Sequence, residues 1–323
     1  MRYGSSRSLT GAKDVSPVSE KKTATCDRCS EAAVIVLKPS GRRLCGDHLA
    51  QDIRARVLVT IREQGMIRDG DRIAVALSGG KDSTALLLLL YSLLPEWNNV
   101  SLVAVTVDEG IGGYRDETIG AAERLAASLG VEHVIISFTG LFGESLDSFL
   151  KGRENQACSV CGILRRNALT KAAKKAGADR LATGHNLDDE AQSVLMNVLR
   201  GDLTRLVRES GIETGHFIPR IKPLQVISEK EIATYLMVRD AWTELPECPY
   251  TRYALRAEVR TMLYDIEYQY PGTMLNLMKS RKKLAGWIPS GKHADPIRHC
   301  ALCGDSCSGE VCQACLLLSS FGR

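Results

Sequence analysis

The hexapeptide Ser78-Gly79-Gly80-Lys81-Asp82-Ser83 constrains the fold of this chain more than any other stretch. It follows the apolar run 73–77 and precedes the apolar run 85–90, so the expected order is a short buried strand, a glycine-rich turn and a helix. Two adjacent glycines let backbone N–H groups approach a phosphate closely, and the helix N-terminus adds partial positive charge. The stretch therefore predicts a phosphate-binding loop, with its serines and its lysine as further donors.

This loop is not a Walker A loop, which requires glycine where Val75 stands and serine or threonine where Asp82 follows the lysine. It resembles the PP-loop of the N-type ATP pyrophosphatases. The resemblance implies cleavage of ATP between the α and β phosphates and activation of a carbonyl oxygen by the AMP half. Amidotransferases, lysidine synthetases and tRNA thiolases share the motif, so the acceptor stays open. The expected nucleotide contacts here are Ala76, Ser78, Gly79, Gly80, Lys81, Asp82 and Ser83.

Strands and helices are expected to alternate beyond the loop. The patterns predict strands over 101–107, 131–137 and 180–183, and helices over 115–129 and 161–176. Such alternation indicates an α/β fold with a doubly wound parallel sheet, in which ligands bind beyond the carboxyl ends of the strands. Three loops should therefore converge on one site: 78–83, 108–110 and 184–190.

The third of these loops carries Asp188, Asp189 and Glu190 at a predicted helix start. Three acids beside bound phosphates suit Mg²⁺, although carboxylates at a helix start also act as caps. We expect Asp189 to be catalytic and, with Gly184, to line the nucleotide site. Asp108 follows the second strand and is expected either to contact the nucleotide or to make a plain turn.

The 11 cysteines are an odd number and fall into pairs two residues apart, which fits metal sites in a reducing compartment better than a disulfide framework. Two sets have the spacing of structural zinc sites. The expected ligands are Cys26, Cys29, Cys45 and His48 for the first zinc, and Cys300, Cys303, Cys312 and Cys315 for the second. The fold is thus expected to carry N- and C-terminal zinc-finger modules. Cys307 is left over and receives no role.

Three further cysteines lie outside these sets. Cys158 and Cys161 stand at the start of the predicted helix 161–176, close to Arg165. Thiols at a helix N-terminus near cations have lowered pKa values and favour the thiolate. Cys248 lies far downstream before Pro249 and Tyr250, a position ordinarily typical of a packed thiol.

Taken together, these motifs resemble the 2-thiouridine synthetase family, which includes bacterial and archaeal tRNA thiolases and the cytosolic wobble-uridine thiolase subunit of eukaryotes. The resemblance rests on the PP-loop, CxxCG at 158–162, GHNxDDE at 184–190, Cys-Pro-Tyr at 248–250 and the two zinc sets. It extends from about residue 24 to the end of the chain.

The resemblance implies that Cys158, Cys161 and Cys248 hold a [4Fe-4S] cluster with one iron open to a sulfide. The C2 oxygen of a uridine would be adenylated by ATP, after which sulfur attacks and AMP leaves. Lys81, Arg165 and Asp189 are expected to take part in catalysis. A competing mechanism makes one cysteine a persulfide carrier, with Cys158 and Cys161 forming a disulfide. The family also implies a ubiquitin-like sulfur-carrier protein or free sulfide as donor, and a homodimer.

A nucleic-acid surface must come from local clustering, because the net charge is only +4. Arg252, Arg256 and Arg260 fall on one helix face. Further basic residues lie around Trp287, a mixture that suits a phosphate backbone, although such runs are often only solvated faces. They are Lys279, Arg281, Lys282, Lys283, Lys292 and Arg298. With the family resemblance, tRNA is the expected partner.

The expected organisation has five parts: a disordered tail (1–23), an N-terminal zinc finger (24–50), the PP-loop ATP-binding catalytic domain (51–245), a basic helical tRNA-binding segment (246–295) and a C-terminal zinc ribbon (296–323). No secretory signal is evident, and the apolar run 85–94 is too short to span a bilayer, so we expect a soluble cytoplasmic protein without membrane contacts.

Three functions compete. The first is ATP-dependent 2-thiolation of a tRNA uridine, with wobble uridine 34 favoured over uridine 54 because the lysine and glutamate enrichment of thermophile proteins is not evident. The second keeps adenylation but transfers nitrogen, as lysidine synthetases do, which would leave three spaced cysteines without a purpose. The third is a zinc-ribbon RNA-binding scaffold with an inactive nucleotide site, against which the intact SGGKDS loop argues.

Overall fold

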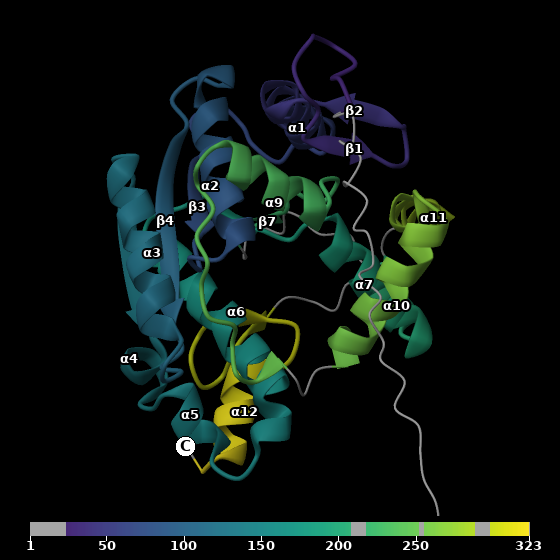
Figure 1. Ribbon diagram of the computed structural model, residues 1–323. Helices are drawn as coiled ribbons and strands as arrows, with labels where there is room; N and C mark the ends of the chain where they lie inside the picture. The colour runs from purple at the N-terminus through teal and green to yellow at the C-terminus, as the bar shows by residue number, and fades with distance from the viewer. Residues whose placement is uncertain (1–23, 208–217, 252–254, 288–297, 323) are drawn as a thin grey trace, which may run out of the picture.

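A parallel five-stranded sheet forms the centre of the computed structural model, which describes residues 24–207, 218–251, 255–287 and 298–322 (Figure 1). The strand order is β5-β4-β3-β6-β7, and all neighbours run parallel. The chain winds outward from β3 to β5 and then returns to the other side of β3. The predicted doubly wound α/β fold is therefore confirmed. The strands are β3 (Arg72–Ala76), β4 (Ser101–Asp108), β5 (Glu132–Ser137), β6 (Arg180–Ala182) and β7 (Arg220–Ile221).

Helices cover both faces of this sheet. Ile73 and Val75 of β3 are buried together with residues of α2 (Lys81–Leu93) and α3 (Arg115–Ser128). Ala74 lies in a second core with α6 (Ala157–Lys175). Because successive side chains of a strand point to opposite faces, an unbroken apolar run is what a strand buried on both sides requires. The loops that follow these strands are thus held on a rigid, two-sided core.

The N-terminal module is a hairpin, β1 (Ile35–Leu37) and β2 (Arg42–Leu44), followed by α1 (Gly46–Glu63). Its apolar residues belong to the same core as α2. Asp52 on α1 is buried and accepts from Arg42 Nη1 at 2.7 Å and from Arg56 Nε at 2.8 Å, which ties the hairpin to the helix. The module therefore packs onto the domain that contains the five-stranded sheet and not as an independent unit.

A helical layer lies beyond β6 and β7, seen around the labels α7, α10 and α11 in Figure 1. α7 (Leu187–Leu199) shares a core with α10 (Leu255–Gln269) and α11 (Thr273–Trp287).

The other helical elements described before the C-terminal ribbon are short. They are η1 (Leu94–Glu96), α4 (Phe138–Phe142), α5 (Leu146–Leu150), η2 (Glu154–Gln156), α8 (Leu203–Val207) and α9 (Glu229–Val238).

The C-terminal ribbon consists of β8 (Arg298–His299), β9 (Ser306–Cys307) and α12 (Gln313–Ser320). It packs beside α6, as the yellow segment in Figure 1 shows. Asp305 accepts from Asn167 Nδ2 and Lys174 Nζ of α6, each at 3.3 Å. Buried residues of the ribbon and of α6 form a single core. The ribbon is therefore an integral support of α6.

Several element bounds differ from the sequence expectations. The helix predicted over 161–176 begins at Ala157, so Cys158 and Cys161 lie within its first two turns. The strands predicted over 131–137 and 180–183 are observed as Glu132–Ser137 and Arg180–Ala182. The predicted disordered tail 1–23 lies outside the described residues. Within the described residues, no helix is long and apolar enough to cross a bilayer.

Candidate active site

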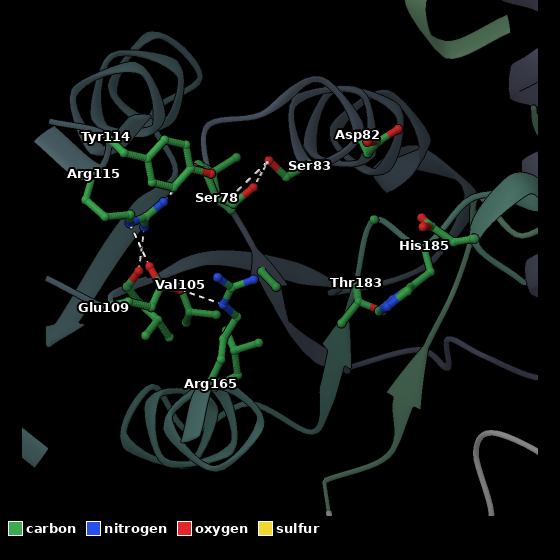
Figure 2. A pocket seen from close by; sticks show the side chains of 16 residues that line it. Ser78, Asp82, Ser83, Val105, Glu109, Tyr114, Arg115, Arg165, Thr183 and His185 are labelled. Carbon is green, nitrogen blue, oxygen red and sulfur yellow. Dashed lines mark hydrogen bonds and ion pairs between the residues drawn. The ribbon is translucent and has the colours of Figure 1, made fainter. Parts of the chain in front are cut away.

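A cavity of about 320 Å³ opens at the carboxyl ends of β3, β4 and β6. This is where a doubly wound sheet reverses its strand order and binds ligands. Figure 2 shows side chains from all three converging loops pointing into it. Gly79, Gly80, Lys81 and Asp108 do not line it. The predicted site residues that line it are Ala76, Ser78, Asp82, Ser83, Arg165, Gly184 and Asp189.

The phosphate-binding loop has a conformation that only glycine fits at position 79. Gly79 has φ +88°, and a Cβ there would stand 2.0 Å from the Thr118 carbonyl oxygen. The Ser83 hydroxyl accepts from the backbone N–H of Ser78 at 3.1 Å and donates to the Gly80 carbonyl at 2.8 Å. These contacts hold the loop closed against α3, with the α2 N-terminus facing the cavity.

Gly184 allows the third loop to approach the first. A Cβ on Gly184 would lie 3.0 Å from the Asp82 carbonyl carbon. Asn186 bridges the same two loops, because its Nδ2 donates to Asp82 Oδ1 at 2.9 Å. The convergence expected from the sheet topology is thus observed as direct contact.

Lys81 is held by carboxylates beside the cavity. Its Nζ lies 3.0 Å from Asp82 Oδ2 and 2.9 Å from Glu229 Oε1. Burial acts to lower the pKa of Lys81, but the charge of Asp82 and the hydrogen bond and charge of Glu229 outweigh it and raise the pKa. Lys81 therefore stays protonated, and a bound phosphate would compete with Glu229 for its ammonium group.

The three acids of the third loop have different surroundings. Glu190 is buried between Lys222 at 2.6 Å and Arg281 at 3.3 Å, and Asp188 accepts from the backbone N–H of Glu229 at 2.8 Å. Burial raises the pKa of Asp188 to about 6. Asp189 alone of the three lines the cavity. It also forms a capping box with Asn186 at the start of α7, so the capping role considered from sequence applies to the expected catalytic residue itself.

Asp108 makes a turn. Its Oδ1 accepts from the backbone N–H of Gly110 at 2.8 Å, as the turn alternative predicted. The acidic residue of this loop that reaches the cavity is Glu109. Glu109 is 2% exposed and lines the cavity with Tyr114 and Arg115, to which the sequence analysis gave no role. The sequence offered only two signals for these residues: Glu109 follows a predicted strand, and Arg115 comes six positions later. Neither signal predicts that the two side chains meet.

Both terminal cysteine sets come together. In each set the four ligand atoms lie within 4.8 Å of one another. The Cys29 and Cys45 sulfurs are 3.7 Å apart, and so are those of Cys303 and Cys312. A tetrahedron with metal–sulfur bonds of about 2.3 Å has edges of about 3.8 Å, so both sets fit zinc. Cys307 stays outside, with its thiol donating to the Gly309 carbonyl at 3.0 Å.

Comparison with known proteins identifies the family. The PP-loop domain profile matches residues 50–266, and the profile of the N-terminal LIM domain of the 2-thiouridine synthetase TtuA matches residues 25–50. The chain is 37% identical over 316 residues to tRNA 2-thiolation protein NcsA of Haloferax volcanii, covering 92% of this chain and 98% of the relative. The chain belongs to the PP-loop tRNA 2-thiolation family.

Two other members extend the comparison. Cytoplasmic tRNA 2-thiolation protein 1 of Bos taurus is 39% identical over 310 residues, covering 92% of this chain and 88% of the relative. A solved structure, titled U34-tRNA thiolase NcsA from Methanococcus maripaludis with its [4Fe-4S] cluster, aligns with a TM-score of 0.81 at 30% identity, covering 93% of this chain and 97% of the other. The predicted family membership is therefore confirmed.

The three cysteines that this 2-thiolation family resemblance singled out lie next to one another. The Cys158 thiol donates to the Tyr250 carbonyl at 3.7 Å, and the charges of Cys158 and Cys248 both act on Cys161. Within the described part of the chain, these three do not form a group as tight as the two zinc sets. Three neighbouring thiols are the donor set that a [4Fe-4S] cluster with one open iron would need.

The expected lowering of the thiol pKa is wrong for Cys161. Burial raises the pKa of Cys161 to about 11, outweighing the opposing charge of Arg165. Burial likewise raises the pKa of Cys248. The helix N-terminus and its cationic neighbours therefore do not override desolvation, because Cys161 faces the core shared with the ribbon.

The arginines expected to contact tRNA are partly engaged in ion pairs. Arg256 Nη1 lies 3.2 Å from Asp189 Oδ1, Arg260 Nη2 makes a two-point contact to Glu229 at 2.7 and 2.8 Å, and Arg281 pairs with Glu190. Trp287 is 78% exposed, and the neighbouring Lys279, Lys282 and Lys283 are exposed too. Arg298, before the ribbon, is exposed as well. Arg252 and Lys292 lie outside the described residues.

Proposed function

We propose that this protein is an ATP-dependent tRNA-uridine 2-sulfurtransferase that adenylates the C2 oxygen of the uridine before sulfur replaces it. One observation carries the proposal: Arg165 lines the nucleotide cavity, and its charge acts on both Cys161 and Cys248. Arg165 is therefore common to the surroundings of the cavity and of these two cysteines, which supports adenylation and sulfur transfer at adjacent sites. A lysidine-type enzyme or a scaffold would not require this juxtaposition.

In the first step the uridine C2 oxygen attacks the α-phosphorus of ATP and pyrophosphate leaves. The amides of Ser78–Ser83 and the α2 N-terminus bind phosphate oxygens, and Lys81 exchanges Glu229 for the phosphates. Asp189, which lines the cavity, would hold Mg²⁺, and the ion would supply positive charge for the phosphates. In the second step a sulfur nucleophile adds to C2 and AMP leaves.

The residues that would hold a [4Fe-4S] cluster are Cys158, Cys161 and Cys248. Held by these three thiolates, such a cluster would supply an iron with an open position for sulfur chemistry. The protein itself contributes two further effects. The core formed by α6 and the ribbon keeps Cys161 out of water. Arg165 provides a positive charge between the two reaction centres. The persulfide mechanism uses the same cysteines and is separated from this one by the iron content.

The names of the relatives support tRNA as the partner and a cytoplasmic location. Since the Methanococcus maripaludis structure is titled a U34-tRNA thiolase, we favour the wobble uridine over uridine 54. We infer a cytoplasmic location, because the Bos taurus and Mus musculus relatives are named cytoplasmic. The donor in this proposal is a ubiquitin-like carrier with a C-terminal thiocarboxylate or free sulfide, and the protein acts as a homodimer.

The first experiment measures iron, acid-labile sulfide and zinc per chain after anaerobic purification, together with 2-thiouridine formed on tRNA transcripts. We expect about four iron, four sulfide and two zinc, with iron lost and zinc kept in Cys248→Ala. A transcript with cytidine at position 34 should stay unmodified. Active protein with zinc but no iron would replace the cluster with the persulfide mechanism, and absence of any ATP-dependent 2-thiouridine would refute the function.

A further inference from the structure

Glu109 is a buried carboxylate between two arginines. It follows β4 and is 2% exposed, a position that a charged group keeps only when it is paired. Its Oε1 lies 2.6 Å from Arg165 Nε, and its Oε2 lies 2.8 Å from Arg115 Nε. Figure 2 shows Glu109 between these two side chains at the edge of the cavity. One carboxylate therefore connects α3 with α6.

Arg115 anchors this connection to the phosphate-binding loop. It is 4% exposed, and its guanidinium donates to the Ser78 carbonyl at 3.3 Å, to Thr118 Oγ1 at 2.9 Å and to the Val107 carbonyl. These three hydrogen bonds fix the orientation of the Arg115 guanidinium. The Glu109 carboxylate is thus fixed relative to the loop that binds the nucleotide.

Arg165 is the more exposed partner. It lies one helical turn after Cys161 on α6, lines the cavity, and its side chain is 45% exposed. A long, half-exposed arginine has many rotamers, and confining it to one loses rotamer entropy that the ion pair must offset. Within the described residues, Glu109 is the carboxylate that forms an ion pair with it.

We propose that Glu109 is a positioning residue that fixes the Arg165 guanidinium between the nucleotide and the sulfur site, using Arg115 and the Ser78 carbonyl as its reference. The proposal rests on the proposed function, since the centres it aligns are those of adenylation and sulfur transfer. Removing the charge of Glu109 leaves ground-state binding of ATP and tRNA in place and releases Arg165 from the geometry that the reaction needs.

The test compares Glu109→Gln, Arg165→Gln and the double variant in the 2-thiouridine assay. Glu109→Gln should lower kcat about 10- to 100-fold and leave both KM values within about threefold. Added to Arg165→Gln, it should lower kcat by less than about threefold, because the group through which it acts is already gone. In ¹⁵N-arginine spectra of the purified protein, the protected Nε–H signal of Arg165 should disappear in Glu109→Gln.

A matched control is Asp71→Asn, which removes the charge of another buried carboxylate, paired with Arg180 at 3.2 Å at the opposite end of the sheet. It should destabilise the protein without lowering kcat. If Glu109→Gln does not fold, Glu109→Asp keeps the charge but shortens its reach and should show the same loss of kcat. A wild-type kcat in a folded Glu109 variant, or additive effects with Arg165→Gln, would overturn the proposal. A wild-type protein that makes no 2-thiouridine would instead overturn the proposed function.

Discussion

Arg256 of α10 lies 3.2 Å from Asp189 of the third loop, so the helix expected to contact tRNA is ion-paired to the acid expected to act on the nucleotide. The pair is partly exposed, with the side chains 43% and 30% accessible. A solvent-screened pair of this kind contributes little to stability. Its consequence is geometric, because a change in α10 on tRNA binding would reach Asp189 directly.

The Asp189 carboxylate is expected to be needed for catalysis and not for folding. Asp189→Asn keeps an N3 side chain that can accept the capping bond but removes the charge, so kcat should fall at least about 100-fold while the melting temperature changes little. Thiolation rate and thermal unfolding measure the two effects. Glu231→Gln, the N3 position of the other capping box, in α9, should keep the wild-type rate. An Asp189→Asn enzyme with normal turnover would contradict the assignment.

Gly79→Ala should abolish nucleotide binding. The new methyl group would stand 2.0 Å from the Thr118 carbonyl oxygen at a φ of +88°, so the loop must move away from α3. Gly130→Ala has a φ of +64° but nothing within 4 Å of the added carbon, and it isolates the cost of backbone strain, about 1 kcal/mol. Calorimetric titration with an ATP analogue and denaturant unfolding separate the two variants. Equal affinities would show that the close approach to α3 is not required.

The two zinc sites are expected to affect the cysteine triad unequally. Cys300→Ser should lose one zinc per chain and also lower the iron content, because the ribbon shares its core with α6. Cys26→Ser should lose one zinc and retain iron, since its module packs against α1 and α2. Metal analysis of both variants, purified in parallel under anaerobic conditions, gives the comparison. Full iron content in zinc-depleted Cys300→Ser would disprove the dependence.

His133 is expected to make stability fall as the pH drops below about 6.5. Burial lowers the pKa of His133 despite the opposing charge of Glu123, and its Nε2 lies 2.7 Å from Thr106 Oγ1. Below the ordinary pKa of histidine, His133 is protonated in the unfolded chain but stays neutral in the folded protein. The free energy of unfolding therefore decreases as the pH falls. The slope cannot exceed about 1.4 kcal/mol per pH unit for one proton.

His133→Gln should show a shallower pH dependence between about pH 7 and 5.5, because glutamine keeps a polar contact to Thr106 without titrating. Denaturant unfolding at several pH values, expressed as the difference between wild type and variant, removes the effect of metal release, which both proteins share. A difference that is constant with pH would mean that His133 does not account for the acid sensitivity.

Local sequence patterns were sufficient for the sheet, the phosphate-binding loop and both zinc sets. Each depends largely on neighbours in the chain: Gly79 has a φ that favours glycine, and the closely spaced cysteine pairs of the two terminal sets bring their ligand atoms together. Strand alternation also fixed the edge of the sheet at which the three loops meet.

Pairings between distant segments could not be obtained in this way. The contacts of Glu109 with Arg165 and of Asp189 with Arg256 join residues more than fifty positions apart. Nothing in composition or periodicity specifies which arginine a carboxylate meets. The prediction of a lowered thiol pKa for Cys161 failed for the same reason. Burial raises this pKa, and part of the burial comes from the distant C-terminal ribbon.

The packing of the ribbon on α6 has a consequence for biosynthesis. The helix that carries Cys158 and Cys161 is completed by contacts from residues 300–321, which leave the ribosome long after it does. A nascent chain that has only reached Cys248 holds all three cysteines of the triad but lacks the apolar cover on Cys161. The apolar cover of Cys161 is therefore completed only when the ribbon has been synthesised and packs on α6.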